Sequence, residues 1–156
     1  LFRVKAALFS DGLELSHAAV SELDGQQYVI LGEHTLSQHD YLRRFKTTCR
    51  EIFDQAWKTA EGQGAFDSLF FNSDGFLLEG GRSNVFVKYQ GQWLTPSLDS
   101  DILNGVMRQA VLKQPQLYLG ADTIKETHIT RTMLENAEEI RLSNALRGVF
   151  AVSLRK

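Results

Sequence analysis

The segment from Phe66 to Thr95 constrains the fold more than any other part of the chain. Its apolar residues fall into short runs separated by turn residues: Phe66–Phe71, Phe76–Glu79, Asn84–Tyr89 and Trp93–Thr95. Apolar runs of this length, bounded by Asn72-Ser73-Asp74-Gly75 and Gln90-Gly91, are typical of strands joined by turns. We therefore expect an antiparallel meander in this part of the chain.

Strand patterns also occur toward both ends of the sequence. Ser10-Asp11-Gly12 is a good hairpin turn, because Asp-Gly readily supplies positive φ. The polar stretch from Gly32 to Arg44 has no clear periodicity and is predicted to be a linker to a new unit. The further predicted strands are Arg3–Phe9, Leu13–Val20, Gln27–Leu31, Asp122–His128, Glu139–Ser143 and Val149–Leu154.

The longest helix is predicted after the capping box Thr48-Cys49-Arg50-Glu51, whose hydroxyl and carboxylate would satisfy opposite free amides. Apolar residues then recur at helical spacing, and Gly62 and Gly64 end the helix. This apolar stripe consists of Ile52, Phe53, Ala56, Trp57 and Ala60. The shorter predicted helices are Gly105–Lys113, stopped by Pro115, and Thr130–Ala137. Together the elements predict an α+β fold, a mixed α/β class with a largely antiparallel sheet and packed helices.

Composition narrows the class of protein. With 156 residues the chain is long enough for one ordinary core and too short for two comfortable domains. A net charge of −2 gives no electrostatic reason to expect nucleic acid, and no apolar run approaches the roughly 18 residues of a membrane span. Cys49 is the only cysteine and the four histidines show no ligand spacing, so no metal site is predicted. A cytoplasmic location is the default expectation.

Two residues stand out chemically, an amine and an acid. Lys46 lies two residues before the predicted helix start, where the positive end of the helix dipole disfavours the ammonium form. Glu79 closes the apolar run Phe76-Leu77-Leu78, where the pattern expects an interior residue and a buried carboxylate needs a partner. Such an amine can form an imine with an aldehyde, and such an acid can hold a protonated pyridine nitrogen. The ordinary alternatives are a solvated lysine and a strand-end glutamate that reaches water past two glycines.

Three further groups could bind anions. The segment Leu103-Asn104-Gly105-Val106-Met107-Arg108 places backbone amides at a helix start, which is a ready-made phosphate cradle, although every helix has such amides. Ser143-Asn144-Ala145 adds small polar donors at the end of an apolar strand, and these are also normal turn residues. Arg147 could meet a substrate carboxylate in a bidentate pair or could be an ordinary surface residue.

Taken in order, these motifs resemble the class IV aminotransferase family, the fold-type IV pyridoxal-phosphate (PLP) enzymes. The resemblance runs from about Arg44 to the C-terminus and is greatest to the 4-amino-4-deoxychorismate lyase branch, especially its fusions with the synthase. The ordered motifs are Phe45-Lys46-Thr47-Thr48, Phe66-Asp67-Ser68-Leu69-Phe70, Glu79-Gly80-Gly81-Arg82-Ser83-Asn84, Trp93-Leu94-Thr95-Pro96, Leu103-Asn104-Gly105-Val106-Met107-Arg108 and Leu142-Ser143-Asn144-Ala145-Leu146-Arg147-Gly148.

The resemblance implies a role for each group. Lys46 matches the Schiff-base lysine, which also shuttles protons, and Glu79 matches the carboxylate that binds the pyridine nitrogen. The phosphate would be bound by the helix start and by a second loop. The residues implied for phosphate are Leu103, Gly105, Val106 and Met107 at the helix and Ser143 and Asn144 in the loop, with Arg147 for substrate.

The resemblance also implies a domain organisation. Residues 35–156 would form the large PLP-binding domain of the D-amino acid aminotransferase-like fold. Residues 1–34 would be the last strands of the small N-terminal domain plus a linker. The first part of that domain, which normally supplies a phosphate-binding arginine and much of the substrate pocket, is absent from the sequence. A homodimer, possibly fused to or associated with an upstream domain, is expected by analogy.

The sequence departs from the family pattern at three places. Asn104 stands where the family usually has proline, Asp99-Ser100-Asp101 replaces a commoner glycine-containing stretch, and Phe53 replaces a frequent tyrosine. The first functional hypothesis is a lyase of folate biosynthesis that converts aminodeoxychorismate to 4-aminobenzoate and pyruvate. The alternatives are a transaminase of D- or branched-chain amino acids, which shares every motif, and a non-catalytic remnant.

Overall fold

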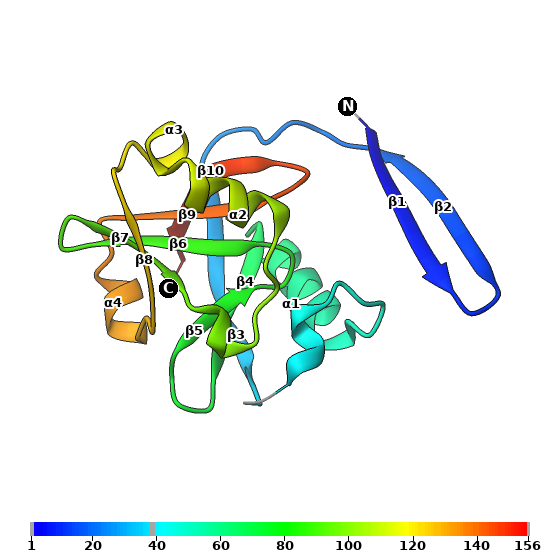
Figure 1. The fold of residues 1–156 in the computed structure, drawn as a ribbon, viewed down its shortest axis with the longest axis horizontal. Helices are drawn as coiled ribbons and strands as arrows, with labels where there is room; N and C mark the ends of the chain where they lie inside the picture. The colour runs from blue at the N-terminus through cyan, green and yellow to red at the C-terminus, as the bar shows by residue number, and fades with distance from the viewer. Residues whose placement is uncertain (1, 38–39, 156) are drawn as a thin grey trace.

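The computed structural model describes residues 2–37 and 40–155. Its body is an eight-stranded sheet in the order β5-β4-β3-β10-β9-β6-β7-β8, and a separate two-stranded hairpin, β1-β2, projects away from it (Figure 1). The strands are β1 (Phe2–Phe9), β2 (Gly12–Ala19), β3 (Gln27–Leu36), β4 (Asp67–Asn72), β5 (Leu77–Gly80), β6 (Asn84–Tyr89), β7 (Gln92–Pro96), β8 (Ile124–Thr127), β9 (Glu139–Asn144) and β10 (Gly148–Leu154). The helices are α1 (Glu51–Gly62), α2 (Val106–Lys113), α3 (Pro115–Leu119) and α4 (Arg131–Glu135), with 3-10 helices at Tyr41–Arg44 and Leu98–Ser100. The predicted α+β class with a largely antiparallel sheet is confirmed.

The sheet curls until its two end strands come together. Phe76, just before β5, forms a bridge with Thr130, just after β8. The amide of Leu77 donates to the carbonyl of Ile129 at 2.8 Å. The inside of the curl holds the largest apolar cluster, which includes the buried Leu134 of α4.

The predicted meander is wrong as a connected unit, although all of its strands form. The pairs β4–β5 and β6–β7 are antiparallel hairpins, but three other strands separate them in the sheet order. The chain turns out of β5 through residues 80–83, where the amide of Gly80 donates to the carbonyl of Ser83 at 2.7 Å. The apolar runs determine which residues form strands. The turn at residues 80–83 determines that β6 pairs with β9 and not with β5.

The predicted linker from Gly32 to Arg44 is also wrong where the structure describes it, because this stretch holds the end of β3 and the first 3-10 helix. Residues 38–39 lie outside the described residues. The strand β3 continues to Leu36 and pairs in parallel with both β10 and β4. Beyond Leu31 only β4, among the described strands, pairs with β3, through Thr35 and Leu36, and this backbone pairing keeps a polar stretch extended although the sequence pattern assigns it to a loop. The division of the chain between residues 34 and 35 stays a prediction, and β3 runs across it.

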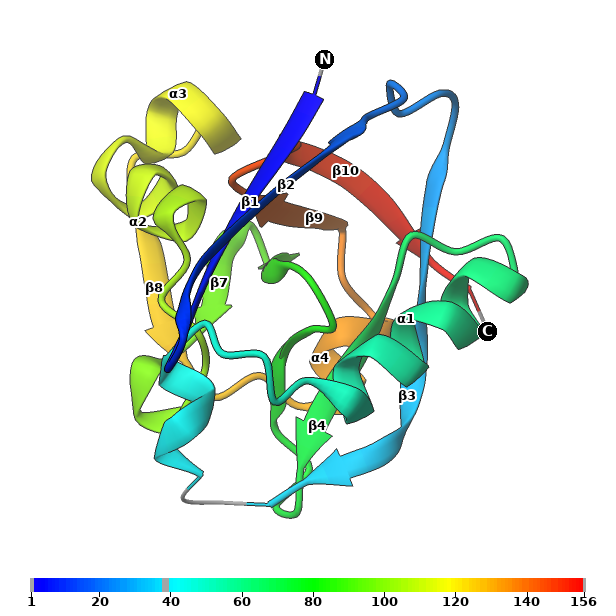
Figure 2. The same ribbon diagram turned by 90° about the vertical axis from the view of Figure 1, so that its right-hand side faces the viewer.

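The first helix shows how tertiary contacts override local capping. The helix α1 lies against β4 (Figure 2). The apolar stripe is confirmed, because Ile52, Phe53 and Ala56 pack against the cluster that contains Phe70. The predicted capping box is wrong: α1 begins at Glu51, Arg50 is its N-cap, and no described side chain caps it. The residues before Arg50 instead stay outside the helix.

The helices α2 and α3 pack against the part of the sheet that β6, β7 and β8 form. The predicted helix from Gly105 is confirmed as α2, which ends at Lys113. Pro115 not only stops it but begins α3, because proline is well suited to the first position of a helix. Val111 and Leu119 pack against Phe86 of β6. Among the described residues, no helix is long and apolar enough to cross a membrane.

Candidate active site

The carboxyl group of Glu79 is buried at the end of β5, with only 6% of the residue exposed. Its two oxygens accept from the amide of Leu103 at 3.2 and 3.3 Å, and Nδ2 of Asn84 lies 3.5 Å from Oε2. Burial raises the pKa of Glu79 to about 8, and the Leu103 amide and the charges of Arg43 and Arg50 only partly oppose this rise. The acid is therefore protonated at neutral pH unless a further cation approaches it.

Lys46 lies in the segment between the first 3-10 helix and α1. Although the residue is exposed, the surrounding protein removes part of the amine's hydration, and this lowers the pKa of Lys46. The charge of Arg50 lowers that pKa further, whereas the charge of Glu79 raises it. The charge of Glu79 thus acts on the Lys46 amine, and the pairing of these two groups in one site stays a prediction.

A glycine at position 105 allows the side chain of Asn84 to reach the loop before α2. Nδ2 of Asn84 donates to the carbonyl of Leu103 at 2.8 Å. A Cβ atom at Gly105 would lie 2.4 Å from Oδ1 of Asn84, well inside contact distance. Because Gly105 is the N-cap and no described side chain caps α2, the first amides of this helix remain available to an anion.

Ser143 brings an unpaired hydroxyl to the same region. It is fully buried, and its Oγ has no hydrogen-bond partner among the described residues. Ser143 is the register partner of Asn84 in the β6–β9 ladder, so their side chains share one face of the sheet. Asn144 closes the following turn, since its Oδ1 accepts from the amides of Leu146 and Arg147 at 3.1 and 2.8 Å.

Some of the predicted site residues make contacts that differ from their predicted roles. Arg147 lies in the turn between β9 and β10, where its guanidinium donates to the carbonyl of Ser21. Val106 is 74% exposed at the start of α2, while Met107 packs against the cluster around Phe86. The amide of Leu103 is directed to Glu79. Leu103 is thereby placed to hold the acid.

Asp67 is a buried acid that sequence reasoning did not assign a role. It accepts from the amides of Ser68 and Arg82 at 2.9 and 3.0 Å and from Oγ of Ser83 at 2.6 Å. Burial raises the pKa of Asp67, and these hydrogen bonds partly offset the rise. Asp67 therefore fixes the turn that follows Glu79. The signal was present, because Asp67 interrupts an apolar run just as Glu79 closes one.

Arg108 is a second buried residue to which sequence reasoning assigned no role, and unlike Asp67 it has no signal in the local pattern. It is 1% exposed, and its Nη2 donates to the carbonyl of Pro96 and to Oε2 of Glu126, both at 2.9 Å. Its Nη1 donates to Oδ1 of Asn104 at 3.2 Å. Arg108 therefore fixes the segment that leads into α2, whereas an arginine in a short helix normally indicates an exposed face.

The unusual segment around Asp101 has a structural explanation. Asp101 has a φ of 55°, the left-handed conformation that glycine adopts most easily. Its carboxylate binds Nε of Arg44 at 2.6 Å, and its carbonyl accepts from Nε of Arg43 at 3.2 Å. Two arginines before Lys46 thus hold the loop that a glycine-containing stretch occupies in the resembled family.

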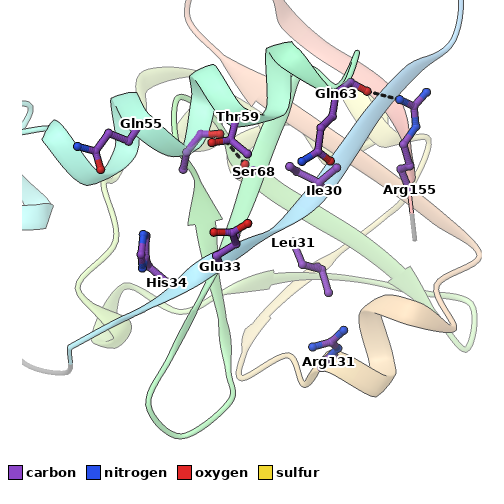
Figure 3. Close-up of a pocket in the computed structure, with 12 residues that line it drawn as sticks. Ile30, Leu31, Glu33, His34, Gln55, Thr59, Gln63, Ser68, Arg131 and Arg155 are labelled. Atoms are coloured by element: carbon purple, nitrogen blue, oxygen red, sulfur yellow. Dashed lines mark hydrogen bonds between the residues drawn. The ribbon is translucent and has the colours of Figure 1, made fainter.

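A cavity of about 450 Å³ lies elsewhere, between α1 and β3 (Figure 3). Gln55 and Thr59 line it from the helix, and Glu33 and His34 from the strand. None of the candidate residues described above lines this cavity or a second one beside Trp93. Among the described residues, no group of three or more histidine, cysteine or acidic residues is placed to hold a metal.

Comparisons with known proteins agree on one family. A family model described as amino-transferase class IV matches residues 3–154. A Schizosaccharomyces pombe protein named "Putative aminodeoxychorismate lyase" is 32% identical over 106 residues, covering 67% of this chain and 44% of that protein. A "Probable branched-chain-amino-acid aminotransferase" of Aquifex aeolicus is 32% identical over 57% of this chain and 28% of its own length. The chain thus spans less than half the length of these curated relatives.

A solved structure supports the same grouping. It is described as a "putative branched-chain amino acid aminotransferase" from Thermotoga maritima and superposes with a TM-score of 0.83 at 27% identity. The match covers 99% of this chain and 57% of that one. The curled sheet and its helices are therefore shared with a longer protein.

Proposed function

Because the chain belongs to the class IV aminotransferase family, we propose that it carries the PLP-binding part of an aminodeoxychorismate lyase. In this proposal Lys46 is the catalytic amine, Glu79 faces the pyridine nitrogen, and an amine-bearing small molecule is the substrate. One observation carries the proposal most: the buried acid Glu79, with a pKa of about 8, acts by its charge on the Lys46 amine, whose pKa is lowered. Acids and amines with perturbed pKa values are typical of catalytic sites.

The residues present fit the cofactor. Ser143 has a buried hydroxyl without a partner among the described residues, and it shares a sheet face with Asn84, which contacts the loop before α2. An unpaired buried hydroxyl and uncapped helix amides are the donors that a phosphate group requires. At the other end, a cationic ring nitrogen would let Glu79 ionise in its buried position.

PLP, when bound, supplies an aldehyde that amines can attack and a ring that withdraws electrons. The low pKa of Lys46 favours the neutral amine that can react with this aldehyde. Lys46 then takes and returns a proton at the amine-bearing carbon of the substrate. With PLP bound, Glu79 would hold the ring nitrogen protonated, and the amides of Val106 and Met107, with Ser143 and Asn144, would hold the phosphate. The backbone of Gly105 would leave room for it, since the Gly105 amide itself donates to the carbonyl of Leu103 at 2.9 Å. Arg147 would bind a substrate carboxylate only after releasing Ser21.

Two alternative functions are considered. A transaminase of branched-chain or D-amino acids is supported by the relatives from Aquifex aeolicus and Thermotoga maritima. The third candidate is a non-catalytic member of the family, for which the replacement of a frequent tyrosine by Phe53 speaks. We favour the lyase because the segments around Lys46 and Arg147 resemble the lyase branch of the family.

The proposal extends to the surroundings of the site. We propose a homodimer that acts in folate biosynthesis in the cytoplasm, with residues 35–156 as the PLP-binding domain and residues 1–34 as strands of a second domain plus a linker. These assignments follow the family resemblance and can be tested on the whole protein by its mass in solution and its reaction products.

The first experiment identifies the lysine whose amine reacts with PLP. The protein is incubated with PLP and reduced with borohydride, and the peptides are weighed. We expect the mass of reduced PLP on the peptide that contains Lys46, its loss in Lys46→Ala, and its retention in the control Lys113→Ala. Labelling that persists unchanged in Lys46→Ala would reject the assignment.

The second experiment identifies the reaction. The protein is incubated with PLP and aminodeoxychorismate, and separately with PLP, an amino acid and 2-oxoglutarate. Release of 4-aminobenzoate together with pyruvate supports the lyase, and formation of glutamate supports the transaminase. Binding of PLP with neither product supports the remnant.

A further inference from the structure

Arg50 connects the two halves of the candidate site. It lies four residues after Lys46 and is the N-cap of α1. Its side chain crosses to the turn after β5, where Nη2 donates to the carbonyl of Gly81, two residues after Glu79. The segment that carries the amine and the strand that carries the acid are therefore joined by one guanidinium.

Other contacts fix the direction of this side chain. Nε of Arg50 lies 3.6 Å from a carboxylate oxygen of Asp54, one turn along α1. Its guanidinium carbon lies 5.4 Å from the centre of the Phe53 ring. That ring packs edge-on against the buried Phe70, with centroids 5.1 Å apart. An arginine held on three sides reaches Gly81 in one defined orientation.

We propose that Arg50 is a positioning residue of the candidate site, whose guanidinium fastens the strand end carrying Glu79 to the segment carrying Lys46. The proposal rests on the proposed function and adds a residue that neither the sequence motifs nor the comparisons single out. Arg50 itself is not assigned any contact with substrate or cofactor.

The charge of Arg50 acts on both reactive groups in the direction that the chemistry needs. It lowers the pKa of Lys46, which favours the neutral amine, and it lowers the pKa of Glu79, which favours the ionised acid. The other groups that act on Glu79 are the Leu103 amide and Arg43, which lower its pKa, and Asp67, which raises it. Glu79 is the other charged group that acts on Lys46, and it raises that pKa.

The neighbouring arginine cannot replace Arg50 in this position. Arg43 donates to the carbonyls of Ser37, Ser100 and Asp101, so its guanidinium is held by other segments of the chain. Arg43 acts on Glu79 by charge but binds no described residue of the turn after β5. Arg50 is the arginine that joins this turn to the amine segment.

The test measures the pKa of the Lys46 amine without any cofactor. The protein, the variants Arg50→Gln and Arg50→Lys, and the control Arg131→Gln are treated with a small amine-modifying reagent over a range of pH. Arg131 pairs with Glu135 on α4, so its removal changes the net charge equally without touching the site. Mass spectrometry of the Lys46 peptide gives the rate of modification at each pH.

We expect Arg50→Gln to shift the pH profile of Lys46 to higher pH and to slow its modification at pH 7.5 at least threefold. Arg50→Lys keeps the charge and should restore most of the profile, and Arg131→Gln should leave it unchanged. A wild-type profile in folded Arg50→Gln would overturn the proposal, as would an equal shift in Arg131→Gln.

The fastening contact is measured separately through the affinity for PLP. Arg50→Lys should bind PLP at least threefold more weakly than the parent, because an ammonium does not reproduce the held fork that reaches Gly81. This measurement decides the question if Arg50→Gln does not fold, and an unchanged affinity would overturn the proposal. Failure of the parent to bind PLP would reject the proposed function instead, while the pH profile of Lys46 would still stand.

Discussion

Asn84 and Ser143 are direct partners across the antiparallel β6–β9 ladder, and both are buried. The amide of Asn84 is engaged by the carbonyl of Leu103, whereas the hydroxyl of Ser143 has no partner within the described chain. Buried polar groups are normally satisfied, and those that are not often await a ligand. Asn84 therefore stabilises the structure of the site, whereas the hydroxyl of Ser143 is available to bind a ligand.

Ser143→Ala tests this difference. The substitution removes no hydrogen bond, so stability without cofactor should change by less than about 0.5 kcal/mol, while affinity for PLP or inorganic phosphate falls. The matched control is Ser68→Ala, since the Ser68 hydroxyl is equally buried but donates to the carbonyl of Ala56 at 2.8 Å. It should lose about 0.5–1.5 kcal/mol in urea unfolding and keep its affinity for PLP. Equal losses of affinity in the two variants would contradict the assignment.

Gly105→Ala should disturb the site through a contact and not through the backbone. The φ of Gly105 is −59°, which alanine adopts freely, but the new Cβ would lie 2.4 Å from Oδ1 of Asn84. Displacing Asn84 breaks its bond to Leu103, so we expect a loss of about 1–2 kcal/mol and weaker binding of PLP. In Gly62→Ala the Cβ meets nothing within 4 Å, and stability should not fall. Identical unfolding midpoints for the two variants would refute the steric argument.

Glu79→Gln should change how stability depends on pH. The pKa of Glu79 is about 8 in the folded protein and about 4.5 when unfolded, so the folded state binds the proton more tightly. This group's contribution to stability is therefore fully present below pH 4.5 and is lost as the pH rises through 8. Relative to the parent, the glutamine variant should gain roughly 2–4 kcal/mol between pH 5 and pH 9. Unfolding curves that stay parallel over this range would show that Glu79 is not buried as an acid.

Arg108→Met should be far more damaging than the same change at Arg131. Arg108 is buried and donates to Pro96, Glu126 and Asn104, so its removal leaves the carbonyl of Pro96 without this donor. We expect a loss of about 2–4 kcal/mol in urea unfolding, together with weaker binding of PLP as the start of α2 loosens. Arg131 forms an exposed pair with Glu135 on one helix, which contributes about 0.5 kcal/mol or less. Similar losses at both positions would contradict the positioning role of Arg108.

Local patterns in the sequence predicted most of the individual elements correctly. The apolar runs of β4 to β7 and the helical stripe of α1 are recorded directly in residue spacing, because one face of each element is buried. Such local patterns could not predict how the chain passes from β5 to β6. This connection depends on Asp67, which holds the backbone of a turn that begins thirteen residues later in the chain.

The candidate site was predictable in part for a similar reason. Glu79 could be singled out because an acid at the end of an apolar run contradicts the local pattern. Arg50 could not, since the capping box assigned this stretch to a helix start, and no pattern indicated a contact between Arg50 and the turn after β5. Its contact with Gly81 joins residues far apart in sequence, and no local pattern records such a contact. Long-range polar contacts therefore remained outside what the sequence could show.

Among the described strands, β10 is the last in sequence and has a central position in the sheet. On one side of it lie β3, β4 and β5, which are synthesised early, and on the other side lie β6 to β9. On the ribosome these two groups emerge before the strand that unites them, each with an unpaired edge. Such edges invite pairing with other chains. Until β10 has emerged, the nascent polypeptide is thus more open to such pairing than the folded sheet, and this is the stage at which a chaperone would protect it.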